Sequence, residues 1–200
     1  MTTLIVARHG ETDWNFERRW QGHSDTPLNE TGRAQARGLA ASLAGRGIEA
    51  VYSSDLARAR ETAEIVAATL GLEVRLDPRL REVDVGEWSG LTSTEVEQRY
   101  PDGHRERREG GTGWTTGEPF DAMGARVLAA LGAIAQETPG SVVLVVTHGG
   151  PLRAARAACG DDRSDWTSAG NCDVDEFVIG DGGMRWLDST RGGLHQQVQG

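Results

Sequence analysis

The sequence predicts an α/β protein, a three-layer α/β/α sandwich with a mostly parallel central sheet, formed by residues 1–200 as a single domain. Three observations favour this fold. Short apolar runs at 4–7, 48–52 and 142–146 are typical of strands buried on both faces of a sheet. Segments with helical spacing of apolar residues separate these runs, which indicates alternation of strands and helices. No linker divides the chain, and no repeat of roughly 20–50 residues, as in solenoids, occurs in it.

In the N-terminal half, capping residues predict where the helices begin and end. Asn29 is a good N-cap for a helix that continues to residue 43 and stops at Gly45. We expect Asp55 to cap the next helix, which Gly71 closes. The predicted strands cover residues 4–7, 48–52 and 73–76, and residues 13–27 form an ordered loop.

The middle of the chain is the least regular part, and the C-terminal part returns to apolar periodicity. A lid or insertion is expected over about residues 86–117, with a short helix over 93–100 that halts before Pro101 and a surface loop over 103–117. Pro119 begins a helix whose apolar stripe reaches Ile134 and packs in the core. The last predicted elements are a strand over 142–146, a helix over 151–158, a hairpin over 174–179 and 184–187, and a poorly ordered tail over about 189–200.

Composition excludes several classes of function. The net charge of −9 argues against nucleic-acid partners, which need a basic face. All 21 basic residues are arginine, which rules out a Walker A loop and Schiff-base lysines. Cys159 and Cys172 are too few for a disulfide framework and lack the spacing of a metal site. The chain shows neither a signal peptide nor a run of about 20 apolar residues, so we expect a cytoplasmic protein that does not bind membranes.

Two distant strands end in the same pattern of residues. Arg8-His9-Gly10 follows the first strand, and Thr147-His148-Gly149 follows the strand over 142–146. Ligands of open α/β sheets bind at the carboxyl ends of the strands, so neighbouring strands would bring both imidazoles together there. Arg58 lies in the first turn of a helix, where an arginine is unfavourable to the helix dipole unless an anion compensates. Each residue alone has an ordinary structural explanation, but together they predict an anion site.

The chemistry that fits this set is phosphoryl transfer. A phosphomonoester carries about two negative charges, which the guanidiniums of Arg8 and Arg58 can hold and stabilise. A neutral His9 imidazole can attack phosphorus to give a phosphohistidine, provided that its other ring nitrogen is held by a hydrogen bond, which we expect from the backbone. Both arginines would repel a metal cation, and the reaction needs neither a metal nor a cofactor. The leaving oxygen needs a proton from a carboxylic acid. Three residues remain candidates for that acid: Glu82, Asp84 and Glu87.

Four motifs that contain these residues follow one another along the chain. They are Arg8-His9-Gly10-Glu11-Thr12 with Asn15 and Gln21-Gly22, Ser53-Ser54-Asp55-Leu56-Ala57-Arg58, Leu80-Arg81-Glu82 with Trp88 and Gly90-Leu91, and Thr147-His148-Gly149-Gly150. In this order they resemble the histidine phosphatase superfamily, in the branch of the cofactor-dependent phosphoglycerate mutases and their phosphatase relatives.

The resemblance implies a phosphoglycerate mutase-like fold and a role for each motif residue. It implies that His9 is the nucleophile and that Glu82 is the general acid, and later the base that activates water. The remaining residues that it places at the phosphate are Arg8, Asn15, Gln21, Gly22, Arg58, His148 and Gly149. Pro119 replaces the serine of a Gly-Glu-Ser element found in relatives, so no direct role is expected for Glu118.

Departures from the mutase pattern favour hydrolysis. Ser93 stands roughly where mutases carry a lysine, and Val85 stands where they carry a tyrosine. We therefore predict a metal-independent phosphomonoesterase that acts on a small phosphorylated metabolite. The alternatives are a cofactor-dependent phosphoglycerate mutase and a non-catalytic domain that binds a phosphorylated ligand. Three lid arginines could hold a second anionic group or lie in solvent: Arg105, Arg107 and Arg108. The sequence also allows a homodimer.

Overall fold

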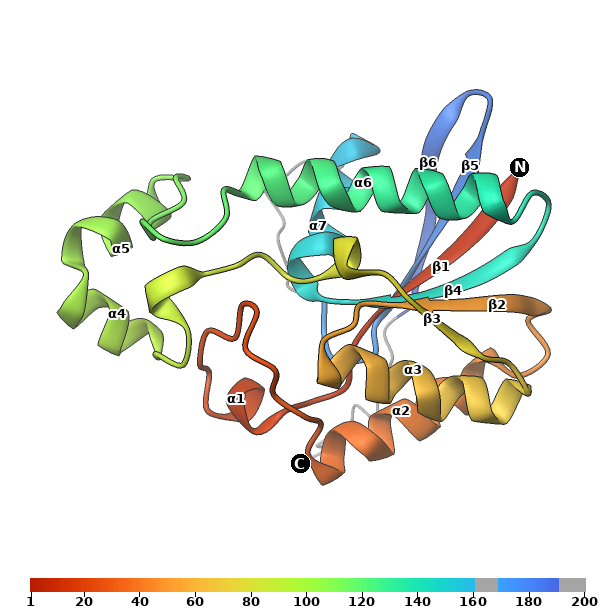
Figure 1. The fold of residues 1–200 in the computed structure, drawn as a ribbon, viewed down its shortest axis with the longest axis horizontal. Helices are drawn as coiled ribbons and strands as arrows, with labels where there is room; N and C mark the ends of the chain where they lie inside the picture. The colour runs from red at the N-terminus through yellow and green to blue at the C-terminus, as the bar shows by residue number, and fades with distance from the viewer. Residues whose placement is uncertain (161–168, 191–200) are drawn as a thin grey trace, which may run out of the picture.

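A mixed sheet with the strand order β3-β2-β4-β1-β5-β6 organises the fold (Figure 1). The structure is a computed structural model that describes residues 1–160 and 169–190. The strands are β1 (Thr2–Arg8), β2 (Ile48–Ser53), β3 (Val74–Leu76), β4 (Val142–Thr147), β5 (Val174–Gly180) and β6 (Gly183–Thr190). The first four strands run parallel, whereas β5 is antiparallel to both β1 and β6. The predicted mostly parallel sheet is confirmed.

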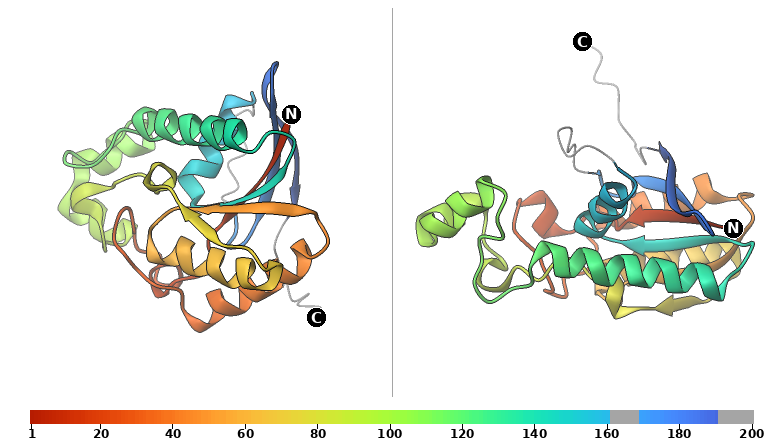
Figure 2. Two further views of the ribbon diagram at one scale, coloured as in Figure 1. Left: turned by 45° about the vertical axis from the view of Figure 1, so that its right-hand side comes forward. Right: turned by 90° about the horizontal axis from the view of Figure 1, so that it is seen from above.

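Helices cover both faces of this sheet and complete the predicted sandwich (Figure 2). α2 (Glu30–Leu43) and α3 (Ala57–Leu70) pack on the face formed by strand residues such as Ile5 and Leu144. α6 (Phe120–Glu137) and α7 (Gly149–Ala158) pack on the opposite face, with Leu4 and Val145. Because successive residues of a strand point to opposite faces, an unbroken apolar run fills both cores.

Neighbouring strands in the centre of the sheet set the position of the two histidines. β1 pairs with β4 in a register that places Arg8 opposite Thr147, and the His9 amide donates to the Thr147 carbonyl at 2.9 Å. His9 and His148 therefore leave their strands at the same level of the same sheet edge, as the sequence pattern predicts.

The remaining helices differ from the predicted layout. The expected loop over 13–27 begins with the short helix α1 (Asp13–Phe16). After α4 (Ser93–Arg99), Pro101 ends one helix and begins another, α5 (Pro101–Arg108), where a loop was expected from residue 103. Proline suits the first helical position because its missing N–H has no partner there. Together α4 and α5 project beyond the sheet edge on which the histidines lie (Figure 1).

The start of α3 also corrects a prediction. Asp55 does not cap this helix, whose N-cap is Leu56 without a side-chain hydrogen bond. Instead, Asp55 pairs with Arg81 at 2.7 Å, and Asp25 accepts a hydrogen bond from the amide of Ala57 at 2.6 Å. The cap is thus supplied by a carboxylate from a distant loop.

The C-terminal part agrees with the predicted hairpin, and small differences concern boundaries. α6 extends from Phe120 to Glu137, α7 begins two residues before Pro151, and β6 includes Ser189 and Thr190, which were assigned to the tail. Residues 191–200 of that tail lie outside the described residues. None of the helices described is both long and apolar enough to cross a membrane.

Candidate active site

A cavity of about 220 Å³ lies beyond the carboxyl ends of β1 and β4. Most of the predicted site residues line it: Arg8, His9, Asn15, Gln21, Gly22, Arg58 and Glu82. Its other lining residues are Arg18, Arg19, Trp20, Val83, Val85, Ser93, Phe120 and Arg153. His148 and Gly149 do not line the cavity, but they lie against residues that do.

His9 is held in one tautomer by its own loop. Its Nδ1 lies 2.6 Å from the carbonyl oxygen of Gly10. A carbonyl only accepts, so Nδ1 carries the proton and Nε2 has a free lone pair. The ring is only 3% exposed, and its pKa lies well below the usual value because of burial, to which Arg58 and Arg8 add by like-charge repulsion. The imidazole is therefore neutral, as a nucleophile requires.

His148, the residue that follows β4, contacts the His9 ring. The two ring centroids are 5.1 Å apart, and Nε2 of His148 lies 2.8 Å from the hydroxyl of Ser54. Burial lowers the pKa of His148 well below its usual value, and Arg58 lowers it further. Gly149 follows directly, and a Cβ atom there would lie 3.9 Å from Nε of Arg8. The sequence thus identified two neighbours of the cavity that do not form its surface.

The two predicted arginines are fixed by backbone carbonyls. Arg58 is fully buried and donates from Nη1 to Ser24 and from Nη2 to Gly22, both at 2.8 Å. Arg8 donates from Nη1 to the carbonyl of Ala169 at 2.5 Å. These bonds orient each guanidinium without neutralising it, because a carbonyl carries no net charge.

Polar atoms without partners gather at this site. No group in the described part of the chain hydrogen-bonds to Nε of Arg8, Nε of Arg58 or Nδ1 of His148, although all three atoms are buried. Burial lowers the pKa of Arg8, and lowers that of Arg58 to about 10, while Glu82 opposes both shifts. Buried polar groups normally have partners, so unpaired ones in a cluster of cations indicate a site that binds an anion.

Glu82 is the only one of the three candidate acids that lines the cavity. Its carboxylate accepts hydrogen bonds from the amide of Val83 at 2.9 Å and from the amide of Gly150, which lies 3.1 Å from both oxygens. Glu87 accepts hydrogen bonds from Thr115 and Thr116, outside the cavity. Burial raises the pKa of Glu87, but these hydrogen bonds outweigh it and lower the pKa to about 2. Asp84 accepts from the amide of Gly86.

The predicted pocket residues of the first loop are held by one another. Asn15 accepts from the amide and the hydroxyl of Thr12, each at 3.1 Å, and Gln21 accepts from the same hydroxyl at 3.1 Å. Gly22 has a φ of +50°, and a Cβ atom there would lie 2.7 Å from the side chain of Val85. The position therefore requires glycine on both conformational and steric grounds.

Comparison with known proteins identifies the family. The model of the histidine phosphatase superfamily (branch 1) matches residues 4–190. The chain belongs to this superfamily. The phosphoglycerate mutase-like protein 4 of Arabidopsis thaliana is 42% identical over 156 residues, which cover 76% of this chain and 68% of that protein. The probable phosphoglycerate mutase GpmB of Cronobacter sakazakii is 42% identical over 162 residues, covering 74% and 70%.

Solved structures of the superfamily share the fold over nearly the whole chain. YhfR of Bacillus stearothermophilus superposes with a TM-score of 0.88 and 34% identity, covering 96% of this chain and 100% of that one. A mycobacterial glucosyl-3-phosphoglycerate phosphatase gives a TM-score of 0.81 and 32% identity, covering 92% and 96%. The phosphoserine phosphatase of Entamoeba histolytica gives 0.83 and 25%, covering 96% and 98%. The predicted family and fold are confirmed.

Sequence reasoning missed several residues of this histidine phosphatase site. Arg153 lines the cavity from the second turn of α7, and Gly150 binds the Glu82 carboxylate. Ser54 contacts His148, although it was quoted only as part of a motif. A signal for Arg153 was available, since it lies in the first turn of the helix predicted over 151–158, as Arg58 does in its own helix.

Aromatic residues of the segment 86–117 pack against Phe120 in the cavity wall, and Arg105, Arg107 and Arg108 are not among the residues that line the cavity. Trp114 packs edge-on against Trp88 and tilted against Phe120, at centroid distances of 5.4 and 5.1 Å. Arg107 stacks over the Phe120 ring at 4.5 Å, whereas Arg105 is exposed and pairs with a neighbouring aspartate. Trp88 and Trp114 therefore serve packing here, whereas Trp20 lines the cavity and Phe16 is exposed.

Proposed function

We propose that this histidine phosphatase hydrolyses a small phosphomonoester through a phosphohistidine on His9, with Glu82 as general acid and then as base, and without a metal ion. The observation that carries the proposal is the His9–Gly10 hydrogen bond of 2.6 Å, which leaves Nε2 as the free nitrogen of a neutral ring between Arg8 and Arg58. Cationic groups at this position favour a phosphoryl group over most other substrates.

The first half-reaction transfers the phosphoryl group to the enzyme. The lone pair of His9 Nε2 forms a bond to phosphorus, and the bond from phosphorus to the leaving oxygen breaks. A proton from the Glu82 carboxyl group passes to that oxygen, so that an alcohol leaves. Arg8 and Arg58 stabilise the charge spread over the three equatorial oxygens, and their unpaired Nε groups provide donors for them.

The second half-reaction returns the enzyme to its starting state. The Glu82 carboxylate takes a proton from a water molecule, the water oxygen bonds to phosphorus, and the bond from phosphorus to nitrogen breaks. Inorganic phosphate leaves, and Glu82 is protonated again for the next cycle.

Substitution of the two reacting groups tests this scheme. His9→Ala is expected to abolish both turnover and phosphoenzyme labelling. Glu82→Gln should slow hydrolysis of alkyl phosphates by about 10²–10⁴-fold, the usual contribution of a general acid, and affect activated aryl phosphates much less. His104→Ala provides a control, because His104 lies in the lid beside Glu97. Equal losses of Glu82→Gln on both substrate types would contradict its role as the acid.

A mutase remains the second candidate, because the curated relatives carry that name. Ser93 lines the cavity as a neutral hydroxyl, which supports hydrolysis, since a second phosphate would need a cation there. The assay offers 3-phosphoglycerate with catalytic 2,3-bisphosphoglycerate. Phosphate release supports the phosphatase, whereas efficient isomerisation without phosphate release overturns it. A domain that only binds a phosphorylated ligand would show neither reaction.

A further inference from the structure

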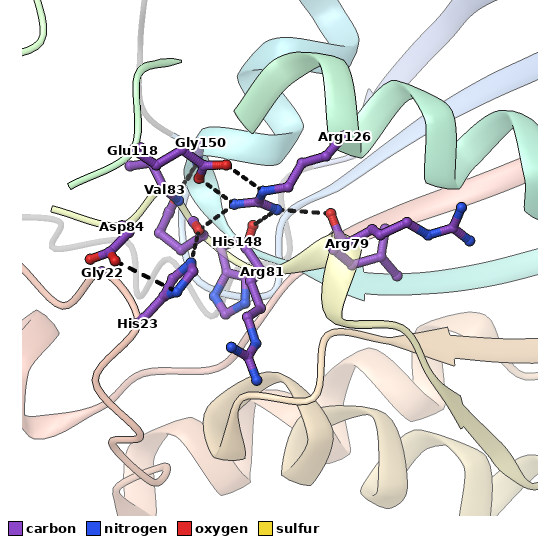
Figure 3. Close-up of polar contacts among 12 residues, drawn as sticks. Gly22, His23, Arg79, Arg81, Val83, Asp84, Glu118, Arg126, His148 and Gly150 are labelled. Carbon is purple, nitrogen blue, oxygen red and sulfur yellow. Dashed lines mark hydrogen bonds and ion pairs between the residues drawn. The ribbon is translucent and has the colours of Figure 1, made fainter. Parts of the chain in front are cut away.

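The guanidinium of Arg126, on α6, uses all its donors within the protein (Figure 3). Nη1 donates to the carbonyls of Arg79 and Arg81, both at 2.8 Å, and Nη2 donates to the carbonyl of Glu82 at 2.7 Å. Nε and Nη2 also bind the two carboxylate oxygens of Glu118, each at 2.7 Å. A guanidinium has five N–H groups, and each of them is paired here.

The backbone that these bonds hold lies outside regular structure. Residues 81–85 belong to neither a helix nor a strand, so no ladder of hydrogen bonds fixes the main chain at Glu82. The Glu82 carbonyl also accepts a hydrogen bond from Nε2 of His23 at 2.8 Å. Arg126 and His23 thus both donate to the main-chain carbonyl of Glu82. The amide of Gly150 donates to the Glu82 carboxylate.

The charge balance distinguishes Arg126 from the arginines of the cavity. Arg8 and Arg58 carry unpaired Nε groups, whereas Arg126 is neutralised by the bidentate carboxylate of Glu118. The side chains of Arg126 and Glu118 are about one-fifth exposed, at 22% and 20%. Neither Arg126 nor Glu118 lines the cavity. Arg126 lies outside the cavity and has no free N–H group, so it does not bind substrate. Its role follows from its hydrogen bonds to the segment that contains Glu82.

We propose that Arg126 is a positioning residue for Glu82 and that Glu118 orients Arg126. The inference rests on the proposed function, because it assumes that Glu82 delivers the proton. Arg126 fixes three carbonyls at and before Glu82, which sets the distance from the carboxyl group to the leaving oxygen. Glu118 acts through Arg126, although its Gly-Glu-Ser element lacks the serine here.

The test compares alkyl and aryl phosphates on the same enzyme preparation. The ratio of the two kcat values is independent of the fraction of folded enzyme, so partial unfolding cannot imitate the effect. In Arg126→Met, kcat for alkyl phosphates should fall by about 10–100-fold more than kcat for aryl phosphates, a part of the full contribution of a general acid. Inhibition by vanadate should be unchanged, because Arg126 does not line the cavity. Arg126→Lys and Glu118→Gln should change the ratio in the same direction by less.

A double variant and a matched control complete the design. With Glu82→Gln already present, Arg126→Met should cause no further loss specific to alkyl phosphates, since both changes remove the same step. The control is Arg156→Met, which removes an equally bidentate but more deeply buried arginine pair, with Asp175, away from the site. An unchanged ratio in all Arg126 and Glu118 variants, while Glu82→Gln changes it, overturns the positioning role alone. An unchanged ratio in Glu82→Gln itself overturns the proposed acid.

Discussion

Gly150→Ala should displace the carboxylate of Glu82 while leaving the helix intact. A Cβ atom at residue 150 would lie 2.1 Å from Oε1 of Glu82, 3.2 Å from its Cδ and 3.3 Å from Cε of Met123. Non-bonded heavy atoms prefer about 3.5–4.0 Å, so the carboxylate must move by roughly 1 Å or more. Because the amide of Gly150 donates to both oxygens, the movement also weakens the bonds that orient the group.

The expected loss follows from this displacement. A misplacement of about 1 Å can cost about 10²-fold in rate, or about 2.7 kcal/mol in activation free energy. We expect this loss for alkyl phosphates and a much smaller one for aryl phosphates. Stability should change little, because alanine favours a helix over glycine by up to about 1 kcal/mol, which offsets the local crowding.

Steady-state kinetics on both substrate types, with urea unfolding of each variant, test this prediction. Gly132→Ala is the matched control, since it lies in α6 and its added methyl group would meet no atom within 4 Å. That variant should gain up to about 1 kcal/mol of stability without a change in rate. A Gly150→Ala enzyme that hydrolyses alkyl phosphates at the wild-type rate would refute the reasoning.

Three further outcomes concern stability and ligand binding. The buried, neutral His9 and His148 have lowered pKa values, so below about pH 6.5 the unfolded chain binds protons that the native protein does not. As the pH falls, the free energy of unfolding should therefore decrease by up to about 1.4 kcal/mol per histidine per pH unit. A urea-unfolding stability that is constant from about pH 7.5 to 5.5 would contradict this. Gly32→Ala should cost about 1–3 kcal/mol in urea unfolding, because its Cβ would lie 2.1 Å from the carbonyl oxygen of residue 11, whereas Gly38→Ala in the same helix meets nothing. Inorganic phosphate and vanadate should inhibit competitively. Phosphate at about 100 times its Kd should raise the free energy of unfolding by about 2.7 kcal/mol. An unchanged free energy of unfolding after phosphate is added would count against an anion site.

The elements that sequence patterns predicted well are those whose cause is local. A short apolar run identifies β1 and β4, and the glycines after His9 and His148 mark where the strands end. The prediction that the two histidines meet required their strands to be neighbours, and the parallel pairing of β1 with β4 fulfils that condition. Burial contributes most to the low pKa of His9, and like-charge repulsion from Arg58 and Arg8 adds to it.

The elements that were predicted wrongly depend on residues far away in the chain. Asp55 looked like a helix cap, but Asp25 supplies that bond and Asp55 pairs with Arg81 instead. Gly103 suggested a loop, yet it lies inside α5, where glycine is needed because the backbone of Gly113 approaches too closely for a side chain. Neither contact follows from local propensity.

The central place of β1 also affects how the chain can fold during synthesis. Both neighbours of β1 in the sheet come from the last third of the chain, at residues 142–147 and 174–180. The strand that precedes the nucleophile is synthesised before the other strands of the sheet, so it has no sheet partner until nearly all the other elements exist. Its apolar side chains and unpaired backbone groups are exposed to other chains for that time. Pairing over such separations is slow, so catalytic competence and protection from aggregation arrive together, late in folding.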